Sequence, residues 1–338
     1  MKFRTIASAS VLSLLLCMGA AGVRAEVSEV RLAAQLGLAY LPLIAMERHK
    51  LVEKHTAKAG LGNVKVTWSR FTGANVMNDA LLSGNLEFAS LGPTPLAIMW
   101  ARTRNTPSEV KGVAAYCTFP LYLNTRNPNI KSIKDFTDKD RIAVPAVKVS
   151  GQALTLQMAA AQAYGEENYG KLDALTIAQS HPDASVQMLS GKSVINAHFT
   201  SAPYHQMQMK DPAIRTVLKS YDVVGGPATA IILVTTAQFR NANPKTYGAV
   251  LAALDEAITI INADKKAAAD LYLKATPGEK ATPQEILKMI EDPDFFYTTT
   301  PHRTLKYAEF MHKVGTIKVK PASWKDLYFP EIHGLPGS

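Results

Sequence analysis

The chain has 338 residues, of which 47% are hydrophobic and 19% charged, a balance typical of a globular protein with material for two hydrophobic cores. Its formal net charge of +9 is compatible with anionic ligands and equally with solubility alone. Of its two cysteines, Cys17 lies in the N-terminal segment and Cys117 in the body, which excludes an intramolecular disulfide once that segment is removed.

Residues 1–25 have the three parts of an export signal. Lys2 and Arg4 precede an apolar stretch around Val11 to Met18, and small residues end the segment at Ala25. The apolar run is shorter than the roughly 20 residues of a spanning helix, so a membrane anchor is disfavoured. Cys17 lacks the preceding small residue of a lipoprotein signal. We therefore expect cleavage after Ala25 and an exported protein.

The first part of the body alternates strands and helices. A strand at Val30 to Ala34 is followed by a helix that ends at Gly60, and a second strand at 64–71 is followed by a short helix and a third strand around 86–92. Val113 to Tyr116 and Leu121 to Asn124 read as strands on either side of a crossover. This order predicts parallel sheets covered by helices.

A second alternating series begins at Ile142. It predicts a strand, a helix at 150–165, a strand near 174–180, a helix at 183–191 and a strand near 194–203. From Asn243 the chain becomes helical, with Pro244 suited to a first helical turn. The C-terminal segment is expected to be an extended surface tail that packs through Trp324, Leu327, Tyr328 and Phe329.

Two stretches, "LLSGNLEFASLGPTP" at 81–95 and "MLSGKSVINAHFTSAP" at 188–203, are alike. Ser83-Gly84 matches Ser190-Gly191, and one inserted residue aligns Ala89 with Ala197. Each copy follows strand, turn and helix in the same order, which indicates two similar lobes, with the Ser-Gly pair ending a helix in each. Ligands of open α/β sheets bind beyond the carboxyl ends of the strands, so the loops that follow the copies are candidate cleft walls.

Two further loops, Phe71 to Asn75 and Lys148 to Gln152, place a hydroxyl and a glycine just before a helix. A helix N-terminus presents unpaired N–H groups and the positive end of the dipole, which suits an anion. The alternative is ordinary capping by Thr72, Asn75 or Ser150. For either loop alone capping is favoured, whereas a pair opposed across a cleft favours ligand contact.

Nearly the whole body resembles the solute-binding proteins of nitrate-, taurine- and sulfonate-type ABC importers, a group with thiamine-pyrimidine-binding relatives. The resemblance rests on "GLAYLPLIAMERHKLVEK", "GANVMNDALLSGNLEFASLGPTP", "NIKSIKDFTDKDRIAVP", "FRNANPKTYGAVLAALDEAITIINADKKAAADLYL" and "SWKDLYFPEIHGLPGS". It implies a two-lobed α/β periplasmic binding protein fold of type II, in which each lobe is an open sheet flanked by helices and a two-crossing hinge joins the lobes. The expected division assigns 26–118 and 225–338 to lobe I and 119–224 to lobe II.

By this resemblance the protein is a periplasmic monomer that captures a small organic anion, a sulfonate or carboxylate, including aromatic ones, and delivers it to an inner-membrane ABC permease. A thiamine-precursor pyrimidine or nitrate is the alternative ligand. The pocket is expected at the turn after the first strand, at the two helix-start loops, after the first Ser-Gly copy and at the second-lobe histidine loops. The expected ligand-binding residues are Gln35, Leu38, Tyr40, Thr72, Gly73, Asn75, Gly92, Thr94, Ser150, Gly151, Gln152, His181, His198, Phe199 and Tyr204.

Other functions find little support in the residues. No metal-ligand spacing accompanies His181, His198 and His205, so neither a metal nor another cofactor is expected. No nucleophile with a base and no paired carboxylates stand out, and Cys117 reads as a buried small apolar residue. We expect no enzyme and no nucleic-acid partner. A biosynthetic enzyme on the same fold and a periplasmic sensor subunit are the competing hypotheses from other classes.

Overall fold

The protein is described by a computed structural model that covers residues 25–35, 37–71, 74–279 and 281–338. The expected export signal therefore lies outside the described residues except for Ala25. Within the described residues, no helix is long and apolar enough to cross a membrane.

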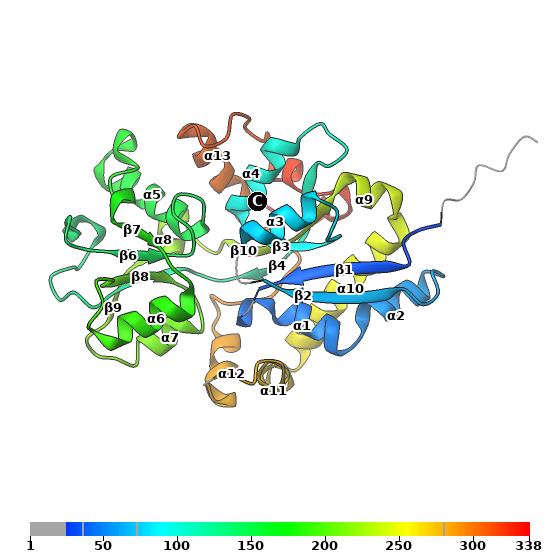
Figure 1. Cartoon of the computed structure of the whole chain (residues 1–338), viewed down its shortest axis with the longest axis horizontal. Helices are drawn as coiled ribbons and strands as arrows, with labels where there is room; N and C mark the ends of the chain where they lie inside the picture. The colour runs from blue at the N-terminus through cyan, green and yellow to red at the C-terminus, as the bar shows by residue number, and fades with distance from the viewer. Residues whose placement is uncertain (1–24, 36, 72–73, 280) are drawn as a thin grey trace, which may run out of the picture.

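Two α/β halves lie side by side, with the middle of the chain in one half and the two ends in the other (Figure 1). The strands of the first half are β1 (Glu29–Ala34), β2 (Lys65–Arg70), β3 (Ala89–Leu91), β4 (Val110–Thr118) and β10 (Thr229–Thr236). Its helices are α1 (Leu41–Arg48), α2 (Leu51–Lys58), α3 (Ala74–Leu82), α4 (Pro93–Thr103), α9 (Ala237–Ala242), α10 (Pro244–Ala263), α11 (Lys265–Ala275), α12 (Pro283–Glu291) and α13 (Thr304–Lys313). Its 3-10 turns are η1 (Leu38–Tyr40), η5 (Trp324–Leu327) and η6 (Pro330–Ile332).

The second half is built from the middle of the chain. Its strands are β5 (Tyr122–Thr125), β6 (Ile142–Val144), β7 (Thr176–Ala178), β8 (Ala197–Thr200) and β9 (Arg215–Lys219). Its helices are α5 (Gly151–Tyr164), α6 (His181–Ser190), α7 (Tyr204–Gln208) and α8 (Ser220–Val224), with the 3-10 turns η2 (Ile133–Asp135), η3 (Glu166–Asn168) and η4 (Asp173–Leu175).

The two halves share one strand order. The second half has a sheet of order β7-β6-β8-β5-β9, and the first half has sheets of order β1-β2 and β3-β10-β4 that a bridge between Leu32 and Phe88 connects. The prediction of parallel sheets was wrong in part. β1 with β2, and β6 with β7 and β8, are parallel, but β5 and β10 are antiparallel to both of their neighbours. Both of these strands follow a segment that links the halves, so they enter their sheets from the opposite end.

The repeated stretches occupy equivalent places in the two halves. Gly84 follows α3 with φ of 73°, and Gly191 follows α6 with φ of 65°, the left-handed conformation in which glycine ends helices without a Cβ penalty. Ala89 then begins β3 and Ala197 begins β8. The prediction that Ser-Gly ends a helix in both copies is confirmed.

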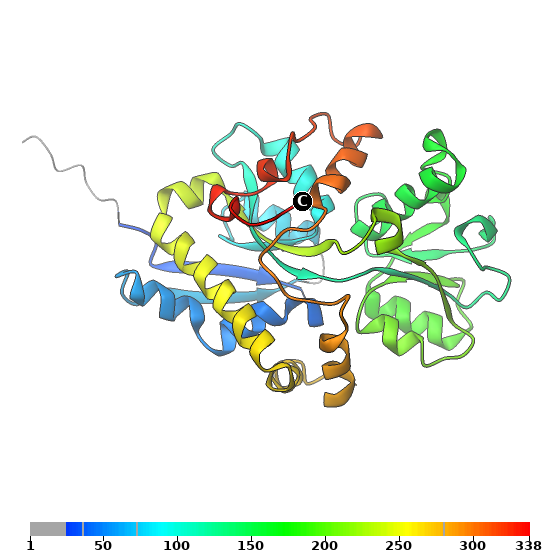
Figure 2. The same cartoon turned by 180° about the vertical axis from the view of Figure 1, so that it is seen from behind.

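Most predicted helices are present, with one difference. The segment after β1 forms two helices, α1 and α2, because Lys50 has φ of 51° and interrupts the expected single helix. Pro244 lies in the first turn of α10, as expected. Seen from behind, this long helix crosses the first half diagonally and packs on α1 and α2 (Figure 2).

The C-terminal tail is packed rather than loosely attached. Trp324, Leu327, Tyr328 and Phe329 are buried, which confirms the predicted packing residues. Two short 3-10 turns replace the expected extended conformation. Phe329 N donates to Gly112 O at 2.9 Å, so the tail closes against β4.

Two segments connect the halves, 119–121 between β4 and β5 and 225–228 between α8 and β10. A third segment, around Phe295, lies against them without crossing: the Phe119 and Phe295 rings stack with centroids 5.5 Å apart. Tyr221 Oη donates to Asp294 O at 2.8 Å, and Lys219 forms an ion pair with the Asp294 carboxylate. This arrangement agrees with the predicted two-crossing hinge.

Candidate functional site

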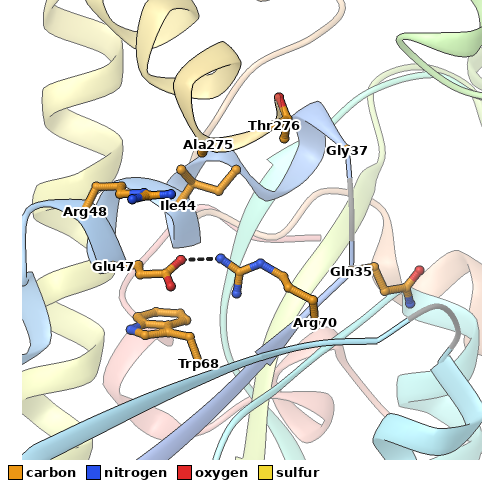
Figure 3. Close-up of a pocket in the computed structure, with 9 residues that line it drawn as sticks. All are labelled: Gln35, Gly37, Ile44, Glu47, Arg48, Trp68, Arg70, Ala275 and Thr276. Atoms are coloured by element: carbon orange, nitrogen blue, oxygen red, sulfur yellow. Dashed lines mark hydrogen bonds and ion pairs between the residues drawn. The ribbon is translucent and has the colours of Figure 1, made fainter. Parts of the chain in front are cut away.

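A cavity of about 230 Å³ opens at the carboxyl ends of β1 and β2 (Figure 3). Its lining comes from the end of β1, from β2, α1 and the end of α11, and consists of Gln35, Gly37, Ile44, Glu47, Arg48, Trp68, Arg70, Ala275 and Thr276. Two guanidinium groups and one carboxylate therefore meet here, so the lining carries an excess of one positive charge. Gln35 is the predicted ligand residue that contributes to this cavity.

Arg70 was not among the predicted residues. It ends β2 immediately before the predicted Phe71 to Asn75 loop, and its guanidinium forms an ion pair with Glu47 from α1. The guanidinium carbon lies 6.0 Å from the centroid of the Trp68 ring, within the range of a cation-π contact. The signal available in the sequence was its place at a strand's carboxyl end, where α/β sheets bind ligands.

The other predicted residues of the first half are largely buried. The Leu38 side chain belongs to the core, while Leu38 O accepts a hydrogen bond from Tyr297 Oη at 2.8 Å. Tyr40 is buried with its ring centroid 6.4 Å from that of Tyr116, and burial raises the pKa of the Tyr40 phenol. Neither side chain belongs to the lining of the cavity at the carboxyl ends of β1 and β2.

Gly92 and Thr94 lie where α4 begins, directly after β3. Gly92 is the N-cap residue of α4 and is partly buried. Thr94 is buried, and its Oγ1 has no hydrogen-bond partner among the described residues. A buried hydroxyl without a partner is costly in a folded protein, so this atom is a donor that a ligand or water would satisfy.

The loop from Thr72 to Asn75 is only partly described. Thr72 and Gly73 lie outside the described residues, and Asn75 belongs to α3 by its backbone. The prediction of ligand contact at these three residues stays a prediction.

In the second half, the predicted loop begins α5. Ser150 Oγ accepts from Ala153 N at 3.2 Å and donates to Ala146 O at 2.7 Å, so this hydroxyl serves as a helix cap. Gly151 is the first residue of α5, and Gln152 follows it. Gln152 Nε2 lies 3.3 Å from Nε2 of His181, the first residue of α6. The structure thus brings two predicted residues together at two helix N-termini.

His198 and Phe199 differ from the predicted lining because both are completely buried in β8. The Phe199 side chain is part of the main hydrophobic core. Both ring nitrogens of His198 contact protein atoms: Nε2 lies 2.9 Å from His181 Nδ1, and Nδ1 lies 2.7 Å from Gln208 Nε2. Adjacent residues of a strand point to opposite faces of the sheet. His198 and Phe199 are nevertheless both buried, because helices cover both faces of this sheet.

Tyr204 lies beside His181 at the start of α7. The two rings stack with centroids 5.7 Å apart and planes inclined by 26°. Burial raises the pKa of Tyr204, with a smaller contribution from the negative charge of Glu279 in the first half. Tyr204 therefore lies at the face of the second half that is directed toward the first.

The histidines of this half are held neutral. Burial lowers the pKa of His181 to about 4 and that of His198 well below its ordinary value. Burial also lowers the pKa of His205 to about 4, although the Asp292 carboxylate opposes the shift. At neutral pH these imidazoles are hydrogen-bonding groups without charge.

A second and larger cavity, of about 610 Å³, lies between α7 and α12. Its second-half side includes Tyr122 and His205, whose rings stack with centroids 3.7 Å apart. Met289 and Asp292 contribute from the first-half side, and an ion pair between Lys210 and Glu285 bridges the two sides. This cavity shows that open space exists between the two halves.

Two features bear on the chemistry of the site. Among residues that the structure describes, no group of three or more His, Cys, Asp and Glu side chains is placed to hold a metal ion. Cys117 is a free, buried cysteine whose pKa is raised by burial, which confirms its reading as a buried residue.

Comparisons with known structures identify the fold. The chain is similar to the alkanesulfonate-binding protein SsuA from Xanthomonas axonopodis pv. citri bound to MOPS, with a TM-score of 0.67, 16% identity, and coverage of 90% of this chain and 96% of that chain. It is similar to the periplasmic aliphatic sulphonate binding protein SsuA from Escherichia coli, with a TM-score of 0.66, 16% identity, and coverage of 90% and 92%. It is also similar to the periplasmic nitrate-binding protein NrtA from Synechocystis PCC 6803, with a TM-score of 0.63, 15% identity, and coverage of 89% and 84%.

These likenesses show a two-lobed α/β fold of the periplasmic binding protein type, as predicted from the sequence. A comparison with curated protein sequences found no match. The NMT1-like family matches residues 24–274, which is most of the chain. The protein therefore belongs to the NMT1-like family.

Proposed function

We propose that this protein is an exported solute-binding protein that captures a small organic anion between its two lobes and delivers it to an ABC permease. Lobe I comprises 26–118 and 225–338, and lobe II comprises 119–224. The ligand belongs to the sulfonates or carboxylates. The fold supports this proposal because the similar structures include sulfonate-binding and nitrate-binding proteins.

The observation that carries the proposal is the position of Arg70. Its guanidinium lines the cavity at the carboxyl ends of β1 and β2 beside Gln35, where an α/β sheet binds its ligand. A guanidinium has five N–H donors in a plane, so the ion pair with Glu47 leaves donors for an oxyanion. A sulfonate or carboxylate presents two or three oxygens to such a group.

Lobe II contributes neutral hydrogen-bond donors. Gln152 and His181 meet at the N-termini of α5 and α6, where the helix dipoles favour negative charge. Tyr204 stacks on His181 and covers one side of this pair. The acidic group of such a ligand accepts hydrogen bonds from Gln152 and His181, and its apolar or aromatic body packs against the Tyr204 ring.

Closure of the lobes is the mechanism that this arrangement supports. The ligand drives closure only if it binds the closed state more tightly than the open one. Groups on separate lobes meet this requirement, because Arg70 and Gln35 belong to lobe I whereas Gln152 and His181 belong to lobe II. The Lys210–Glu285 ion pair also crosses from α12 to lobe II, and its exposure to solvent makes its contribution to this state small.

A thermal-shift panel tests the proposal. The purified chain from Glu26 is melted with benzenesulfonate, benzoate, taurine, nitrate and an aminopyrimidine, each over a range of concentrations. A ligand that binds the folded state raises the melting temperature in a concentration-dependent way. We expect the organic anions to stabilise the protein without chemical change, as judged by mass spectrometry of the ligand. Stabilisation by nitrate alone, by the pyrimidine alone or accompanied by turnover contradicts the proposal.

A further inference from the structure

A continuous line of hydrogen bonds runs through the interior of lobe II to His181. It begins at Thr216 Oγ1, which donates to Asn124 Oδ1 at 2.7 Å, and Asn124 Nδ2 donates to Gln208 Oε1 at 2.9 Å. Gln208 Nε2 then contacts His198 Nδ1 at 2.7 Å, and His198 Nε2 contacts His181 Nδ1 at 2.9 Å. The line ends where His181 Nε2 lies 3.3 Å from Gln152 Nε2.

The two buried amides in this line, those of Asn124 and Gln208, use both of their side-chain N–H bonds. Asn124 Nδ2 makes a second contact with His205 Nδ1 at 3.2 Å, and Gln208 Nε2 donates a second bond to Ser185 Oγ at 3.0 Å. Asn124, Gln208 and His198 are completely buried. Leaving any of these polar atoms without a partner is costly, so the network holds its members together.

This arrangement assigns the proton on each imidazole. With the Gln208 amide oriented so that its Oε1 accepts from Asn124, its Nε2 donates to His198 Nδ1, and the single proton of a neutral His198 is then on Nε2. His198 Nε2 then donates to His181 Nδ1, which places the proton of a neutral His181 on its Nε2. Burial supports the neutral forms, because it lowers the pKa of both histidines.

The line of hydrogen bonds therefore ends at two donor groups that face each other. His181 Nε2–H and the Gln152 amide Nε2 lie 3.3 Å apart, and neither nitrogen is an acceptor for the other. Either a half-turn of the Gln152 amide, which presents its Oε1 to His181 Nε2–H, or one ligand oxygen that accepts from both groups gives these hydrogens a partner. Gln152 and His181 are partly exposed, whereas His198 and Gln208 are not, so these two donors lie at the accessible end.

We propose that Asn124, Gln208 and His198 are positioning residues that hold His181 as a neutral Nε2–H donor, so that His181 and Gln152 together bind one ligand oxygen. This inference rests on the proposed function, and it assigns to His198 an indirect role instead of direct ligand contact. It also defines the chemistry that lobe II selects: an acceptor such as a carboxylate or sulfonate oxygen binds, and a ligand that offers only N–H donors is rejected.

Nitrogen-15 NMR of the ligand-free protein tests the tautomers without any ligand. The protein is labelled at its histidine side chains, and the variants His181→Asn and His198→Asn assign the resonances. We expect both imidazoles to be neutral at pH 7 with the proton on Nε2. A proton on Nδ1 of either ring, or an imidazolium, overturns the inference whether or not the protein binds anions.

A double-mutant cycle with benzenesulfonate tests the positioning role. Gln208→Met removes the donor to His198, and we expect about tenfold weaker binding when His181 is present and no further loss when Gln208→Met is added to His181→Ala. A purely structural role weakens binding by the same factor in both backgrounds and contradicts the inference. Gln157→Met is the matched control, because Gln157 is a buried amide of the same lobe that bonds Asp173 outside this line.

The two proposals fail in different ways. If neither benzenesulfonate nor any other anion of the panel binds, the proposed function is rejected, while the NMR result still decides the tautomers. If benzenesulfonate binds but the spectrum shows His181 protonated on Nδ1, the function stands and the positioning inference is rejected.

Discussion

The guanidinium of Arg70 forms an ion pair with the carboxylate of Glu47, which joins the end of β2 to α1 at the mouth of the lobe I cavity. Both side chains are about one-third exposed, at 32% each. The pair is therefore accessible to a solute, and the fixed Glu47 carboxylate orients the guanidinium.

Substituting Arg70→Ala is expected to weaken benzenesulfonate binding by about 10- to 100-fold, because one charge-assisted hydrogen bond contributes about 1.5–3 kcal/mol. Isothermal titration calorimetry measures the change. Lys65→Ala is the matched control, since Lys65 is a cation of the same strand that is 71% exposed and paired with Glu29 away from the cavity. Equal losses in the two variants would show that general charge, and not the Arg70 site, attracts the anion.

The lowered pKa values of the lobe II histidines predict an acid-sensitive fold. His205 has a pKa of about 4 in the folded protein and about 6.5 when unfolded, so the unfolded chain binds more protons between these values. The free energy of unfolding should therefore have its full value above pH 6.5 and should fall as the pH drops toward 4. Each such histidine contributes at most about 1.4 kcal/mol per pH unit.

Urea denaturation at intervals from pH 7.5 to 4.5 measures this slope. His205→Phe keeps a ring against Tyr122 and removes one titrating group, so its slope should be smaller than that of the native sequence. His49→Gln changes an exposed histidine and serves as the control. An unchanged slope in His205→Phe would show that His205 does not contribute to the acid sensitivity.

Gly112 is predicted to be intolerant of any side chain. A Cβ at this position would lie 2.4 Å from a carbon of the Tyr328 ring, where the C-terminal tail packs on β4. Gly112→Ala should lower the free energy of unfolding by about 1–3 kcal/mol, the usual cost of overpacking.

Gly248→Ala is the matched control for this substitution. Gly248 lies exposed within α10 and has open space around its Cβ position, so alanine should raise stability by about 0.5–1 kcal/mol. Denaturation curves of the two variants should therefore shift in opposite directions. A neutral Gly112→Ala would mean that the tail does not hold Tyr328 against β4.

Cys117 is predicted to be unreactive in the folded protein. It is completely buried, and burial raises the pKa of its thiol, so the reactive thiolate is scarce. In the chain from Glu26, DTNB should label this thiol only at urea concentrations that unfold the protein. Rapid labelling of the native chain would reveal local opening of β4.

The order of the elements could be read from the sequence because local physical chemistry determines it. The Ser-Gly pairs end helices at Gly84 and Gly191, where a left-handed backbone favours glycine, and the strand–helix alternation predicted two α/β lobes. The directions of β5 and β10 were not predictable, since they depend on where the linking segments enter each sheet.

The residues of the candidate site were likewise predictable only in part. Gln35, Gln152, His181 and Tyr204 were predicted from loops at strand ends. Gln35 lines the lobe I cavity, and Gln152, His181 and Tyr204 lie together in lobe II. Arg70 was missed because a strand residue next to an exposed loop has the same local pattern whether it faces solvent or a cavity. Only the packing of α1 and α11 beside β2 makes it part of a cavity.

His198 shows most clearly what tertiary structure decided. The sequence determined that a histidine follows the second Ser-Gly copy, at the start of a strand. Its burial and its two hydrogen bonds depend on Gln208 and His181, which come from α7 and α6. Local sequence determines helices, turns and strands through backbone preferences, whereas the environment of a side chain depends on residues distant in the chain that folding brings together.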